Sequence, residues 1–72
     1  MRRADPIIAI KREQKRRGLI QSDLRLYMGV AANRVSEVMN KRRALTLPMI
    51  RRLHANLGIS ADVLIQPYKL NR

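Results

Sequence analysis

The sequence predicts an all-α domain built from five short helices. Apolar residues recur at spacings of three and four along the chain, which is the period of an amphipathic helix. The three glycines fall at expected helix ends, and the three prolines fall at helix starts or after the last helix. This agreement favours one compact helical domain without a strand, an internal repeat or a linker.

The first helix is expected at residues 6–17. Asp5 followed by Pro6 is a strong start, because Asp accepts hydrogen bonds from the first amides and Pro suits the first turn. Gly18 should end the helix, and the basic residues of its last turn suit the helix dipole. Its buried side is expected to be a set of isoleucines: Ile7 or Ile8, and Ile10.

The next two helices are expected at residues 21–28 and about 32–39, on either side of Gly29. Gly29 can adopt positive φ and so permits a sharp turn, and Val30 can pack between the two helices. Each helix repeats one apolar spacing of i, i+3 and i+4, carried by Leu24, Tyr27 and Met28 in the first and by Val35, Val38 and Met39 in the second. Two short amphipathic helices around one glycine are typical of a helix-turn-helix.

The ends of these two helices carry unusual residues. Ile20 stands where Ser or Thr is usual, so Ser22 or Asp23 is expected to hydrogen-bond the first turn instead. Asn40 is the expected left-handed residue after the third helix.

The last two helices are expected at residues 47–57 and 61–65. Thr46 and Ser60 precede them and are expected to act as their N-caps. Their buried residues are expected to be Ile50, Leu53 and Leu57 in the fourth helix, and Val63 and Leu64 in the fifth. The five helices indicate one domain at residues 5–66. We expect a basic N-terminal arm before it, at residues 1–4, and a C-terminal tail after it, at residues 67–72.

The charge of the chain is strongly positive. Sixteen Lys and Arg residues against five Asp and Glu residues give a formal net charge of +11. Such a domain is expected to bind a polyanion, and the alternative is a well-solvated basic surface. Only two aromatic residues, Tyr27 and Tyr68, are available for stacking, which disfavours single-stranded RNA as the partner.

Several function classes are disfavoured by composition. The chain has no cysteine and one histidine, so neither a cysteine-based metal site nor an acid–base pair can be assembled, and no enzyme activity, metal or cofactor is expected. No apolar run is long enough to span a membrane, and the basic start is not followed by an apolar segment of the length found in a secretory signal. We therefore expect a cytoplasmic protein that makes no membrane contact.

Two stretches carry a family resemblance: residues 18–24, GLIQSDL, and residues 34–54, RVSEVMNKRRALTLPMIRRLH. Together they resemble the lambda-repressor-like helix-turn-helix family (Cro-type, XRE-type), and more closely the DNA-binding domain of HigA-type antitoxins. The resemblance implies a compact five-helix domain, usually a homodimer, that is associated with the bacterial nucleoid through DNA. Such antitoxins bind operator DNA in their own promoter and repress a toxin–antitoxin operon. They also neutralise a HigB-type toxin, a ribosome-dependent mRNA endonuclease.

Two alternatives to operator binding remain open at this point. One is a protein-interaction module that mainly neutralises a HigB-type toxin, through this chain or through a segment outside it. The other is a general phage-type transcriptional regulator.

The outward face of the third helix is the candidate for reading bases. Asn33 can bond adenine in a bidentate way, and Glu37 can accept from the cytosine amino group. Arg34 can reach guanine or a phosphate, or pair with Glu37 along the helix surface. Ser36 can bond a base or a phosphate, and Ala32 can touch a thymine methyl group. The alternative for this face is a solvated polar surface.

The remaining candidate contacts lie at three places along the chain. Gln21, at the start of the second helix, can hold a phosphate together with exposed amides. The turn after the third helix is expected to grip the DNA backbone through Asn40, Lys41, Arg42 and Arg43. The expected dimerisation surface consists of Ile65, Tyr68 and Leu70.

Overall fold

The computed structural model describes residues 5–71, and within that range the chain is helical without a strand. The elements are α1 Pro6–Arg17, a 3₁₀ turn η1 Gln21–Asp23, α2 Leu24–Met28, α3 Ala32–Met39, α4 Leu47–Leu57 and α5 Ala61–Leu64. The radius of gyration is 11.2 Å, that of a compact domain of this length. The predicted basic arm at residues 1–4 lies outside the described residues, as does Arg72.

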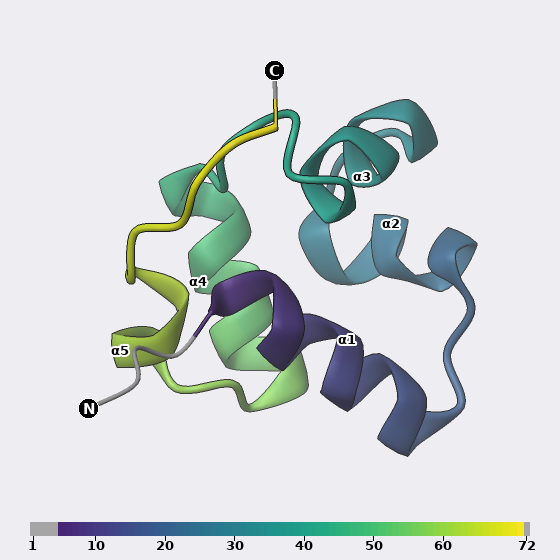
Figure 1. Cartoon of the computed structure of the whole chain (residues 1–72). Helices are drawn as coiled ribbons and strands as arrows, with labels where there is room; N and C mark the ends of the chain where they lie inside the picture. The colour runs from purple at the N-terminus through teal and green to yellow at the C-terminus, as the bar shows by residue number, and fades with distance from the viewer. Residues whose placement is uncertain (1–4, 72) are drawn as a thin grey trace.

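Helix α4 lies at the centre of the arrangement. It packs against α2 on one side and against α5 on the other, while α5 also contacts α1. Helix α3 follows α2 and packs against it and against η1. Figure 1 shows α2 and α3 gathered at one end of the molecule and α5 at the other, with α1 across the front.

Helices α1 and α4 begin and end where the predicted caps stand. The Asp5 carboxylate accepts hydrogen bonds from two first-turn amides at 2.8 and 3.4 Å, and the Thr46 hydroxyl accepts one from the Met49 amide at 3.4 Å. Both helices are followed by a left-handed glycine, Gly18 and Gly58, with φ of 68°. These bounds are confirmed because each cap satisfies amides or carbonyls that the helix itself leaves unpaired.

The second predicted helix is divided into η1 and α2. Ile20 has no side-chain acceptor for the first turn, and the chain instead makes a tight bond from the Asp23 amide to the Ile20 carbonyl at 3.0 Å. The Asp23 carboxylate accepts from the Ile20 amide at 3.0 Å, so Asp23 rather than Ser22 supplies the predicted polar contact. A 3₁₀ turn is one way in which a helix start without a capping oxygen satisfies its first amides.

The end of α3 differs from the prediction in one residue. The left-handed residue is Lys41, with φ of 60°, and not Asn40, whose φ is −94°. The Asn40 side-chain amide donates back to the Ser36 carbonyl at 2.9 Å, which keeps Asn40 close to the helix. The amides of Lys41 and Arg42 then bond to carbonyls of the last turn at 3.0 and 2.8 Å, the pattern of a Schellman motif.

The fifth helix is shorter than predicted. Ser60 precedes α5, but its side chain makes no capping bond, so that part of the prediction is wrong. The helix also ends at Leu64, one residue before the predicted end.

The core is aliphatic and receives residues from every α-helix. Met49, rather than the predicted Ile50, heads the buried stripe of α4, with Leu53 and Leu57 one and two helical turns further on. Ile50 is half-buried at the edge of the same helix. In α1, Ile7 is buried and Ile8 is 50% exposed. The buried apolar residues are Ile7, Ile10, Leu24, Met28, Val35, Val38, Met39, Met49, Leu53, Leu57, Ile59 and Leu64.

Candidate nucleic-acid interface

Helix α3 has one buried side and one accessible side. Val35, Val38 and Met39 are at most 5% exposed and hold the helix against the core, as predicted. The accessible side carries the five predicted base-reading residues: Ala32 and Asn33, which are exposed, and Arg34, Ser36 and Glu37, which are half-buried. The predicted reading face is therefore open to a ligand and is fixed in direction by the buried side.

The turn before α3 is tightly built. Gly29 has φ of 71°, and its amide donates to the Arg25 carbonyl at 2.7 Å. Val30 is half-buried against the core between α2 and α3, where the sequence placed it. The Arg52 side chain of α4 lies over the glycine, since a Cβ at Gly29 would stand 2.5 Å from the Arg52 Nε. The orientation of α3 relative to α2 therefore depends on Gly29.

Glu37 lies between two arginines on the accessible face. Its Oε1 is 3.4 Å from the Arg43 Nε and 3.8 Å from the Arg34 Nε. The predicted pair between Arg34 and Glu37 is thus present, and Arg43 joins it from the following turn. All three side chains are at least 40% exposed, so these pairs add little to stability. Either contact can be given up at small cost.

Two of the three cations in the basic turn after α3 are ion-paired: Arg43 with Glu37, and Lys41 with Asp5. The Lys41 Nζ is 2.6 Å from the Asp5 Oδ2, so a phosphate contact by Lys41 would compete with this ion pair. Partial burial raises the pKa of the Asp5 carboxyl, but hydrogen bonds from Lys41 and from first-turn amides outweigh it, and the pKa lies below its ordinary value of 3.8. Arg42 and Arg43 are exposed.

The other predicted phosphate contacts are accessible at opposite ends of the region. Gln21 is exposed, and it begins the 3₁₀ turn rather than an α-helix. Asn40 is exposed as well, and its side-chain amide is shared between the carbonyl and the hydroxyl of Ser36, at 2.9 and 3.3 Å. The structure thus gathers Asn40 with the reading face of α3.

Comparison of the chain with protein-family models, with curated proteins and with solved structures gave no match. Among residues 5–71, no three side chains of metal-binding type lie together, and no helix is long and apolar enough to cross a membrane. The geometry and charge of the α3 surface therefore carry the functional assignment.

The predicted dimerisation residues lie together at the α4–α5 end of the molecule. Ile65 is 61% exposed, whereas Tyr68 and Leu70 are half-buried. All three line a surface pocket of about 280 Å³, together with residues of α4, α5 and the preceding loop. The Tyr68 hydroxyl is hydrogen-bonded within the chain, so Ile65 is the most available of the three for a partner.

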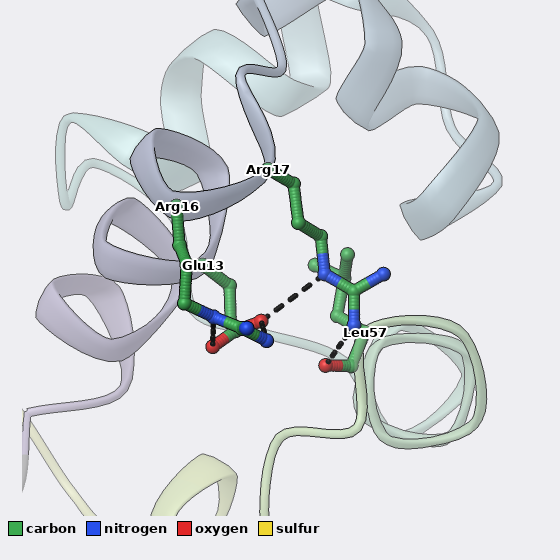
Figure 2. Close-up of polar contacts among 4 residues, drawn as sticks. All are labelled: Glu13, Arg16, Arg17 and Leu57. Atoms are coloured by element: carbon green, nitrogen blue, oxygen red, sulfur yellow. Dashed lines mark hydrogen bonds and ion pairs between the residues drawn. The ribbon is translucent and has the colours of Figure 1, made fainter.

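Some of the arginines stabilise the fold and do not belong to the candidate interface. Glu13 accepts from the Arg16 Nη2 at 2.7 Å and from the Arg17 Nε at 3.1 Å, and Arg17 also donates to the Leu57 carbonyl at 3.1 Å (Figure 2). The hydrogen bonds from these arginines lower the pKa of Glu13 to about 2. The cluster joins the C-terminal end of α1 to that of α4, whose last carbonyls need donors.

Three long-range contacts of the α3 region were not predicted from the sequence. They are the ion pair of Asp5 with Lys41, the hydrogen bond from the Leu45 amide to Tyr68, and the bonds of Asn71 to the basic turn. Each joins residues at least 23 positions apart, and no local sequence pattern pairs them.

Proposed function

We propose that the chain is a sequence-specific double-stranded DNA-binding protein, an antitoxin-type transcriptional repressor that inserts α3 into the major groove. The observation that carries this proposal is the accessible face of α3, which presents Asn33, Ser36 and Glu37 beside the basic turn of a chain with net charge +11. The major groove admits an α-helix, and each base pair there offers a distinct pattern of donors and acceptors.

The elements around α3 support this mode of binding. Helix α2, the three residues 29–31 and α3 follow one another in the order of a helix-turn-helix, in which the second helix enters the groove. Arg42 and Arg43 at the end of α3, and Gln21 before α2, are accessible for phosphate contacts. Phosphate contacts set most of the affinity and make binding weaken steeply with salt.

The more specific biological role rests on the resemblance to HigA-type antitoxins. On that basis the chain binds the operator of its own toxin–antitoxin operon as a homodimer and has a HigB-type toxin as a further partner. Two α3 helices would then enter successive major grooves about 34 Å apart. Pairing of half-sites multiplies affinity, because the second half-site binds at a high effective concentration.

Selection from random duplex DNA, followed by gel-shift titration, tests the proposal. We expect enrichment of a palindromic site, and we expect Asn33→Ala to lose discrimination at one or two base pairs by about 1–3 kcal/mol. Arg42→Ala should weaken all sequences alike. Asn56→Ala is a matched control, because it makes the same change at an exposed residue of α4.

Two results would count against this reading. If no duplex is enriched, the proposed function is wrong. If a site is enriched but Asn33→Ala leaves both the preferred sequence and the affinity unchanged, DNA binding stands and Asn33 is removed from base readout.

A further inference from the structure

The C-terminal tail lies against the turn that follows α3. Figure 1 shows the tail, in yellow, running back alongside the loop between α3 and α4. The Tyr68 hydroxyl accepts from the Leu45 amide at 3.2 Å and donates to the Arg43 carbonyl at 3.5 Å. The Asn71 amide donates to the Lys41 carbonyl at 2.6 Å. The backbone polar groups of the basic turn are thus paired with the tail.

Side-chain contacts reinforce the same attachment. The Asn71 side chain donates to the Asn40 carbonyl at 3.3 Å. The Tyr68 ring is half-buried and lines the 280 Å³ pocket beside Leu45 and Ile50. Burial raises the pKa of the Tyr68 hydroxyl, and the hydroxyl donates to the Arg43 carbonyl.

The turn is also held from the N-terminal side. The Asp5 carboxylate, 36 residues earlier, binds the Lys41 ammonium. Lys41 itself is left-handed, a conformation that residues with a Cβ adopt only when their surroundings fix it. Because the carbonyls of Lys41 and Arg43 are paired with the tail, the turn has one defined backbone path, and the side chains of Arg42 and Arg43 remain exposed.

We propose that the tail is a positioning segment for DNA binding, in which Tyr68 and Asn71 hold the basic turn so that Arg42 and Arg43 face the phosphate backbone. This inference rests on the proposed function. A turn that is already ordered loses less conformational freedom when it binds, and so binds more tightly. Tyr68 then acts within its own chain, and the dimerisation role expected for it passes to Ile65.

The test compares two tyrosine substitutions. Tyr68→Phe keeps the ring and removes the hydroxyl, while Tyr27→Phe makes the same change at the half-buried tyrosine of α2. For each variant we would measure the affinity for the selected duplex at several salt concentrations, the sequence preference, and hydrogen exchange at the Leu45 amide. The oligomeric state is followed by sedimentation.

We expect Tyr68→Phe to weaken binding to all duplexes by about two- to tenfold, the range of one hydrogen bond, without changing the preferred sequence. Exchange at the Leu45 amide should become faster, and the salt dependence shallower because phosphate contacts are lost. Tyr27→Phe should match the original protein. Asn71→Pro, which removes both donors of Asn71 at the end of the chain, should weaken binding in the same uniform way.

The failures of the two proposals can be distinguished. Absence of DNA binding in the unaltered protein refutes the proposed function, and the positioning role with it. If the unaltered protein binds DNA, unchanged affinity in both Tyr68→Phe and Asn71→Pro overturns the positioning role alone. Unchanged exchange at Leu45 shows that the tail does not hold the turn. A loss of self-association in Tyr68→Phe would show that Tyr68 belongs to the dimer surface, and would overturn its positioning role.

Discussion

Substitution of Gly29 by alanine should destabilise the fold more than the same substitution at Gly18. Both glycines are left-handed, with φ of 71° and 68°, and a Cβ costs about 1–2 kcal/mol in that conformation. The lower entropy of the unfolded alanine chain offsets about 0.4–1 kcal/mol. The net cost at Gly18 is therefore about 1 kcal/mol, since a Cβ there has no atom within 4 Å. For a domain of this size that lowers Tm by about 4–8 °C.

Gly29 carries an additional cost because of Arg52. A Cβ at Gly29 would stand 2.5 Å from the Arg52 Nε and 2.8 Å from its Cδ, so the arginine has to move. The arginine is an exposed, flexible side chain, and displacing it from a favourable rotamer costs about 0.5–1.5 kcal/mol. The total for Gly29→Ala is then about 1.5–2.5 kcal/mol.

Urea denaturation followed by circular dichroism measures both costs, because a domain of this size unfolds in one cooperative step. In an Arg52→Ala background, the stability cost of Gly29→Ala should fall to that of Gly18→Ala. Equal costs for the two glycines in the original background would show that Arg52 does not lie over Gly29. If neither substitution changes stability, the left-handed assignment of these glycines is wrong.

Two further predictions concern the fold. The pKa of Glu13 is lowered from 4.5 to about 2 by Arg16 and Arg17, so the stabilising effect of Glu13 is complete above pH 4.5 and is lost as the pH falls to about 2. The free energy of unfolding should therefore depend less on pH in this range in Glu13→Gln. An unchanged pH dependence would contradict the cluster of Figure 2. Leu53→Ala removes a fully buried side chain and should lower the free energy of unfolding, measured by urea denaturation, by about 2–5 kcal/mol. Leu26→Ala, at a leucine that is 77% exposed, should lower it far less. Similar costs for the two variants would refute the assigned core.

The predictable parts of this fold are those that local chemistry decides. The bounds of α1, α3 and α4 could be predicted, because Asp5 and Thr46 supply capping oxygens and Gly18 and Gly58 suit left-handed ends. The buried side of α3 could be predicted from its apolar spacing. The candidate reading face could be predicted as well, because it is the side of the helix opposite the buried side.

The parts that could not be predicted depend on contacts between distant segments. Met49 and Ile50 both fit the spacing of the buried stripe, since they lie four and three residues before Leu53, so the spacing alone does not decide which of them is buried. The left-handed residue moved from Asn40 to Lys41 because the Asn40 side chain bonds back into α3 while the Lys41 carbonyl and ammonium meet Asn71 and Asp5. Sequence periodicity contains no information about such pairings.

Both ends of the described chain meet at Lys41. Asp5 binds its ammonium and Asn71 binds its carbonyl. A bulky or titratable group introduced at either of these two residues would therefore lie beside the turn that carries Arg42 and Arg43, within the surface proposed to face DNA. Labels for binding measurements should accordingly be attached at positions far from Asp5 and Asn71.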